Sequence, residues 1–160
     1  MKSTRLPIVA MLLAACGGRT APPPPREFDG QRAYELVQRQ LEFGPRVPGS
    51  QGHGAMAQWL DSVSSAHADT VVVQSWNHRT ADGNEIPMFN VVARFNPGAT
   101  RRVLYMAHWD TRPHSDSQHS SDSIAPVPGA NDGASGVAVL IGVMEALSRQ
   151  RPSLGVDIVF

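Results

Sequence analysis

The chain has 160 residues, and its 14 Lys and Arg side chains balance its 14 Asp and Glu side chains, so the formal net charge is zero. With 41% hydrophobic residues, a chain of this length holds one ordinary globular domain at most. The balance of charge argues against a nucleic-acid partner, whose phosphates call for a basic surface, and the single cysteine excludes a disulfide within this chain.

Residues 1–16 have the pattern of a secretory signal. Lys2 and Arg5 give a positive start, and the apolar run that follows is too short to span a bilayer. Leu13-Ala-Ala-Cys16 further resembles a bacterial lipobox, in which the cysteine is acylated and becomes the new N-terminus. An ordinary signal peptide with a chance cysteine is the alternative. We therefore expect an exported protein of the bacterial cell envelope, anchored to the membrane through lipidated Cys16, with about 0.8 kcal/mol from each buried methylene.

Residues 17–27 contain four consecutive prolines, Pro22 to Pro25. Such a run favours an extended polyproline II spacer that cannot pack a core. A proline-motif ligand for a partner domain is the alternative. We interpret residues 17–27 as a tether and residues 28–160 as the globular part of the chain.

Two helices are predicted at the start of the globular part. Asp29 can cap a helix that runs to about Phe43, where Gly44 and Pro45 end it. A second helix is predicted over residues 50–64, because its apolar side chains follow the spacing of a buried stripe. The members of that stripe are Met56, Trp59, Leu60 and Val63. Arg46 and His53 are expected at the surface or as supports behind a site.

Three strands are predicted next. Thr70 to Trp76 is β-branched, Ala81 to Asn84 has turn composition, and Ile86 to Phe95 reads as the returning strand. Pro87 indicates that this second strand begins at an edge or unpaired. A third strand, Arg102 to Ala107, precedes a loop, a helix and another strand. This order indicates a mixed sheet with helices on its faces.

The third strand leads directly into His108-Trp-Asp110, and a later segment, Asn131-Asp132, opens the following helix. Ligands bind beyond the carboxyl ends of strands in open α/β sheets, so we expect both segments at one edge of the sheet. Imidazole nitrogen and carboxylate oxygen are ligands that zinc takes. We interpret His108 and Asp132 as half of a metal site. A simple hydrogen-bonded His-x-Asp pair and an ordinary Asn-Asp-Gly turn remain the alternative.

The excursion over residues 111–128 is long for a connection without secondary structure, and such loops are usually functional or disordered. His114 and His119 lie in it and are expected to be solvated, outside the site. The helix predicted from Gly133 to Ser148 has a broad apolar stripe that must pack on the sheet. Its start lacks the Gly-x-Ser-x-Gly pattern of a nucleophile elbow.

Two segments carry a family resemblance. Ala107-His-Trp-Asp-Thr-Arg-Pro113 and Gly129-Ala-Asn-Asp-Gly-Ala-Ser-Gly136 resemble the metal motifs of the zinc aminopeptidase superfamily, which includes the glutaminyl-peptide cyclotransferases. Upstream, Phe43-Gly-Pro-Arg-Val-Pro-Gly-Ser50 is similar to the segment that opens the catalytic domain of glutaminyl cyclases. The resemblance covers residues 28–160 and implies a three-layer α/β/α sandwich with a mixed sheet.

The resemblance also implies roles for three residues. Asp132 is the carboxylate that bridges two zinc ions in the aminopeptidases, or binds the single zinc in the cyclotransferases, and His108 is the ligand of the second metal in the aminopeptidases. Asp110 would accept the imidazole N–H of His108 and fix its tautomer. The general acid/base glutamate and the remaining metal ligands of the family follow the last strand and are absent from this sequence. We therefore expect residues 28–160 to be the N-terminal portion of a longer catalytic domain, inactive by itself.

The sequence thus predicts a zinc-dependent glutaminyl-peptide cyclotransferase, which converts the N-terminal glutamine of a peptide or protein to pyroglutamate and releases ammonia. The continuation from Trp109 to Pro113 and the Phe43 to Ser50 segment favour this branch. A zinc aminopeptidase with two metal ions, which hydrolyses N-terminal residues, is the first alternative. A truncated, non-catalytic envelope lipoprotein is the second.

Overall fold

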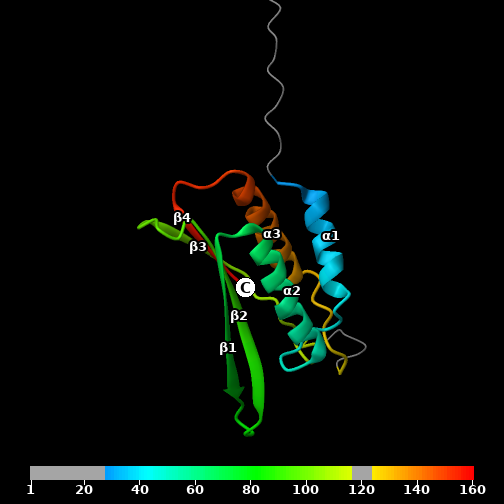
Figure 1. Cartoon of the computed structure of the whole chain (residues 1–160). Helices are drawn as coiled ribbons and strands as arrows, with labels where there is room; N and C mark the ends of the chain where they lie inside the picture. The colour runs from blue at the N-terminus through cyan, green and yellow to red at the C-terminus, as the bar shows by residue number, and fades with distance from the viewer. Residues whose placement is uncertain (1–27, 117–123) are drawn as a thin grey trace, which may run out of the picture.

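The computed structural model describes residues 28–116 and 124–160 (Figure 1). The predicted signal peptide, lipidation site Cys16 and proline-rich tether lie outside the described residues, as does His119. Among the described residues, no helix is both long and apolar enough to cross a bilayer.

Seven elements occur where the sequence predicts them. In chain order these are α1 (Gly30–Leu41), α2 (Gln51–His67), β1 (Thr70–Arg79), β2 (Glu85–Phe95), β3 (Arg102–Met106), α3 (Ala134–Arg149) and β4 (Gly155–Val159). The Asp29 carboxylate caps α1 by accepting from the backbone N–H groups of Gln31 and Arg32. β1 runs past its predicted end at Trp76, because it stays paired with β2 as far as the Arg79–Glu85 pair.

The sheet is mixed, as predicted, with the strand order β1-β2-β4-β3. β2 is antiparallel to both β1 and β4, whereas β3 is parallel to β4. Pairing on the β4 side of β2 begins at Val91, so at Pro87 this side has no strand partner among the described residues, and Pro87 has no N–H to donate. The edge position predicted from Pro87 is confirmed.

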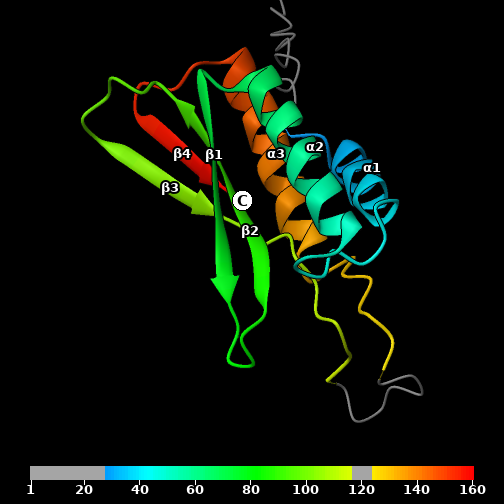
Figure 2. The ribbon, with the colours of Figure 1, turned by 60° about the horizontal axis from the view of Figure 1, so that its bottom comes forward.

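All three helices lie on the same side of the sheet (Figure 2). α2 contacts β1 and β2, and α1 packs on α3. Alternate residues of the central strands point toward the helices and are buried with apolar helix residues. These core residues include Val91, Ala93, Phe95, Val156 and Ile158 from the strands and Met56, Leu60, Ile141 and Met144 from the helices. The described residues therefore form the sheet and one helical layer of the α/β fold.

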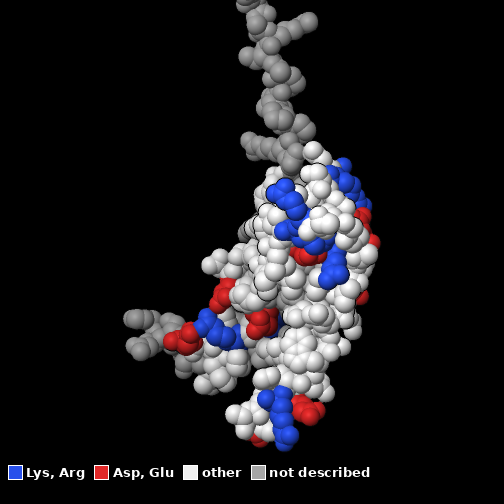
Figure 3. All heavy atoms as spheres, turned by 90° about the vertical axis from the view of Figure 1, so that its left-hand side faces the viewer, with Lys and Arg blue, Asp and Glu red and all other residues white. Residues whose placement is uncertain are grey.

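The edge strand β3 and the face of the sheet away from the helices are exposed. Leu104 and Met106 are 58% and 69% exposed. On this face Arg102 donates two hydrogen bonds to the carboxylate of Asp157, at 2.8 and 2.6 Å, and these bonds hold the pKa of Asp157 below its ordinary value. In Figure 3 the charged side chains form small groups of both signs, as the zero net charge would suggest.

Candidate metal centre

Two segments meet at the carboxyl end of β3. The β3 ladder continues to Ala107, whose N–H donates to the carbonyl of Val159 at 3.1 Å, and His108 follows at once. Asp132 ends the loop before α3. Gly133, with φ at +107°, lets the segments touch, because a Cβ there would lie 2.7 Å from the carbonyl oxygen of His108. The sequence prediction that both segments reach one edge of the sheet is confirmed.

The structure brings His108, Asp110 and Asp132 together. Nε2 of His108 lies 2.9 Å from Oδ1 of Asp132, and Nδ1 lies 3.3 Å from Oδ1 of Asp110. A neutral imidazole carries one N–H and can donate to only one carboxylate at a time. If Nδ1–H donates to Asp110, the lone pair of Nε2 points to the space beside Asp132, which is the arrangement that a histidine metal ligand needs.

Arg112 holds the other oxygen of the same carboxylate. Its Nη2 donates to Oδ2 of Asp132 at 2.9 Å, and its Nη1 pairs with Asp116. The sequence analysis named Arg112 only as part of a motif. Its contact with Asp132 could not be predicted from the sequence, because the two residues lie near opposite ends of the long connection over residues 111–128.

His108 and Asp132 offer the ligand atoms that zinc takes, and both can be reached from solvent. The side chains of His108 and Asp132 are 57% and 52% exposed, so an ion can reach both. Nitrogen and oxygen ligands around a tetrahedral zinc lie roughly 3.3 Å apart, so the observed contact need open by only ~0.4 Å. Among residues 28–116 and 124–160, however, no group of three or more His, Cys, Asp and Glu side chains could hold a metal ion. The described residues therefore offer two ligands, where a catalytic zinc takes three.

A small hollow with aromatic walls lies beside these donors. Its volume is about 120 Å³, and its lining comprises His53, Trp76, Met88, Phe89, Asn90, His108, Trp109, Asp110 and Phe160. The ring of His53 stacks on Trp109 with centroids 4.3 Å apart. The hollow has room for a small chemical group and presents mostly apolar surface to it.

Arg46 and His53 were expected at the surface or as supports behind a site, and the structure excludes the surface. Arg46 is 0% and His53 is 2% exposed. Burial lowers the pKa of His53, an effect that the nearby charge of Asp110 partly offsets. Arg46 tolerates burial because its guanidinium donates to backbone carbonyl oxygens on every side. His114, by contrast, is exposed, and its Nδ1 lies 3.1 Å from the carbonyl oxygen of Ile124, outside the site as predicted.

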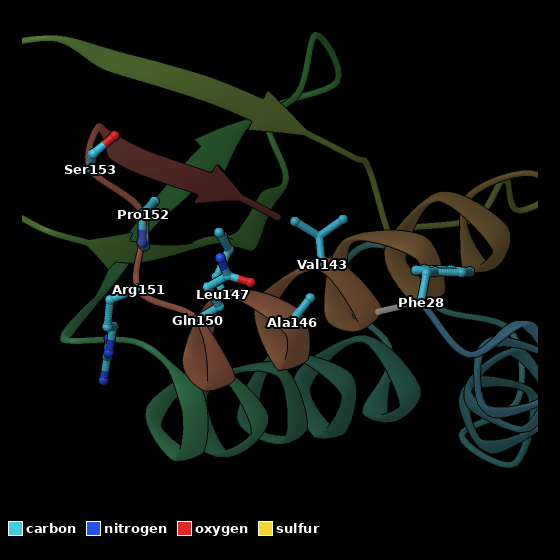
Figure 4. A pocket seen from close by; sticks show the side chains of 8 residues that line it. All are labelled: Phe28, Val143, Ala146, Leu147, Gln150, Arg151, Pro152 and Ser153. Atoms are coloured by element: carbon cyan, nitrogen blue, oxygen red, sulfur yellow. The ribbon is translucent and has the colours of Figure 1, made fainter. Parts of the chain in front are cut away.

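A larger hollow of about 650 Å³ lies at the other end of α3 (Figure 4). Its lining comprises Phe28, Val143, Ala146, Leu147, Gln150, Arg151, Pro152 and Ser153. None of these side chains is a carboxylate, an imidazole or a thiol, so this hollow has no ligands for zinc.

Comparison with known proteins agrees with this geometry. Residues 90–160, which include His108, Asp110 and Asp132, match the model of peptidase family M28. The chain contains part of a peptidase family M28 domain. An uncharacterised Escherichia coli protein, YfbL, is 32% identical over 125 residues, which are 75% of this chain and 38% of that protein.

Two solved structures resemble this M28 chain over 83% of its length. One is glutaminyl cyclase from Porphyromonas gingivalis, with 41% identity, a TM-score of 0.78 and 47% of that chain covered. The other is a Zn-dependent exopeptidase from Parabacteroides distasonis, with 36% identity, a TM-score of 0.79 and 46% of that chain covered. The chain spans less than half the length of each relative. The comparisons support zinc chemistry and the α/β fold, and they favour neither activity over the other.

Proposed function

We propose that the full-length protein is a zinc-dependent glutaminyl-peptide cyclotransferase. It would act on the N-terminal glutamine of a peptide or protein, closing a pyroglutamyl ring and releasing ammonia. The observation that carries this proposal is the hydrogen bond from Arg112 to Oδ2 of Asp132.

A carboxylate that bridges two metal ions gives one oxygen to each. Here Oδ1 of Asp132 faces His108, whereas Oδ2 accepts from the guanidinium of Arg112 at 2.9 Å. A second ion at Oδ2 would have to displace Arg112 and would meet its positive charge, which is repulsive. The arrangement therefore supports one zinc ion, which Asp132 would hold with ligands from outside the described residues while His108 stands beside it without carrying the ion.

The proposed reaction requires that the substrate's amine and its side-chain amide are held close together. The substrate's own N-terminal amine attacks its glutamine side-chain amide, so a C–N bond forms in the ring as the bond to the leaving ammonia breaks. Zinc, when bound, would polarise the amide carbonyl and stabilise the negative charge that develops on its oxygen. Holding amine and amide together in the hollow beside His108 would supply much of the rate. The aromatic side chains of Trp76, Phe89 and Trp109 would give the substrate an apolar surface beside His108.

A zinc aminopeptidase is the second candidate. It is favoured by the 2.9 Å approach of His108 Nε2 to Asp132 Oδ1, because both atoms could face a metal ion. In that case His108 would hold a second zinc and Arg112 would release Oδ2. The substrate would again be a peptide N-terminus, but water would be the nucleophile and the first peptide bond would be hydrolysed.

The product separates the two candidates. Full-length protein incubated with a glutaminyl peptide should release ammonia and the pyroglutamyl peptide, and it should not release leucine from leucyl amide. Release of leucine without cyclisation would favour the aminopeptidase.

We also propose that the protein is exported and anchored in the bacterial cell envelope through lipidated Cys16. The proposal rests on the residue pattern of positions 1–16. Labelling of a bacterial host with a palmitate analogue should tag the wild type and leave Cys16→Ser untagged. Equal labelling of both proteins would rule out acylation at Cys16.

A further inference from the structure

We propose that Arg46 is a positioning residue that places Asp132 for zinc binding by clamping the loop that carries Asp132 to the loop that carries His108. The proposal rests on the proposed zinc site but not on which reaction the zinc serves. Arg46 belongs to the segment 43–50, whose resemblance to glutaminyl cyclases assigns it no role.

The guanidinium of Arg46 contacts both loops. Its Nε donates to the carbonyl oxygen of Trp109 at 3.0 Å, between His108 and Asp110 in the chain. Its Nη1 donates to Pro128 at 3.0 Å and its Nη2 to Gly129 at 2.9 Å, just before Asp132. One rigid group therefore joins the backbones of the segments that carry His108 and Asp132.

The backbone of Arg46 is fixed as well. Its carbonyl oxygen accepts from the N–H of Thr111 at 3.1 Å, and Nη1 also reaches the carbonyl of Gly44 at 3.3 Å. The side chain is 0% exposed. Arg46 is thus bonded to the His108 loop through its backbone as well as its side chain, and its guanidinium also bonds to its own segment.

Only arginine suits this position. Five N–H donors in one plane match acceptors that surround the side chain, whereas the ammonium of lysine donates from a single point. The guanidinium of Arg46 donates to four backbone carbonyl oxygens, and the charge of Asp110 partly offsets the lowering of the Arg46 pKa by burial. A residue that only stabilised the fold would not need its donors divided between these two loops.

Tertiary contacts, rather than a short chain connection, set the distance between His108 and Asp132. Residues 111–128 form a long connection, and closing such a loop costs conformational entropy. One further backbone hydrogen bond, from the N–H of Val127 to the carbonyl oxygen of Arg112 at 3.1 Å, joins the two ends of this connection. Without Arg46, the backbone of Asp132 would be placed mainly by its attachment to α3, and Arg112 would contact only its side chain.

The test compares zinc affinity with stability. Full-length wild type, Arg46→Met, Arg46→Lys and Leu60→Ala are titrated with zinc against a chromophoric chelator, and the thermal midpoints of the metal-free proteins are measured. Leu60 is the matched control, because it is fully buried in α2 and contributes packing alone. All titrations are made well below the lowest midpoint.

We expect Arg46→Met to bind zinc about tenfold or more weakly, the range seen when a partner behind a metal ligand is lost. Arg46→Lys should be intermediate, and Leu60→Ala should lower the midpoint while its zinc affinity stays within about twofold of wild type. If Arg46→Met does not fold, Arg46→Lys decides the question. Wild-type affinity in the folded Arg46 variants, or equal weakening in Leu60→Ala, would overturn the proposal. A wild type that binds zinc without forming pyroglutamate would refute the cyclotransferase alone.

Discussion

Gly129→Ala is expected to disrupt zinc binding in the full-length protein. Gly129 has φ at +68°, where an L side chain costs about 1–2 kcal/mol. Its Cβ would also lie 2.6 Å from the Asp132 carbonyl oxygen and 2.8 Å from Nη2 of Arg46, and it would overlap the Thr111 methyl group. Overpacking of this kind adds about 1–3 kcal/mol, and relief requires the loop that carries Asp132 to move. Chelator competition and urea unfolding measure the two effects.

Gly83→Ala is the matched control. Gly83 also has positive φ, at +89°, but a Cβ there would meet nothing within 4 Å. It lies in the turn between β1 and β2, so Gly83→Ala should lower stability by only about 1–2 kcal/mol and leave zinc affinity unchanged. Equal loss of zinc affinity in both variants would show that backbone strain, rather than the placement of Asp132, is responsible.

Asp132→Asn is expected to abolish zinc binding and activity, whichever reaction the protein catalyses. The substitution keeps the shape of the side chain but removes the negative charge that binds the ion. It also removes the charged acceptor of the Arg112 hydrogen bond, leaving the guanidinium beside the site without a carboxylate at Oδ2. Zinc per chain by elemental analysis, together with turnover of a glutaminyl peptide, measures both losses.

His108→Ala provides the contrast. If Arg112 keeps Oδ2 of Asp132 and the site holds one zinc, His108→Ala should retain about one zinc per chain although turnover falls. Two zinc ions in the wild type and one in His108→Ala would instead support the aminopeptidase.

The regular elements and the meeting of His108 with Asp132 were predictable from the sequence. Apolar periodicity located α2 and α3, and Pro87 located the free side of β2, because each signal is local. The end of β1 was less predictable. Its last residues lie on a hairpin whose pairing, rather than residue type, keeps them extended.

Arg46, His53 and Arg112 could not be placed from the sequence. Each is polar and lies in or beside a loop or helix start, a pattern that is typical of surface residues. Arg46 is buried because its acceptors come from segments 63 and 82 residues further along the chain. His53 is buried because its ring stacks on Trp109, which follows His108 in the chain. These contacts depend on tertiary packing, so they produce no periodic pattern in the sequence.

Identifying the product of the full-length protein tests the central claim most directly. A glutaminyl peptide and the matching leucyl peptide are incubated separately with wild type and with Asp132→Asn, and peptide mass, ammonia and free amino acids are followed. We predict that wild type alone converts the glutaminyl peptide to a product lighter by one ammonia, with ammonia and product formed in equal amounts and no free glutamine or leucine. Release of leucine or glutamine by the wild type, with no pyroglutamyl product, would contradict the cyclotransferase.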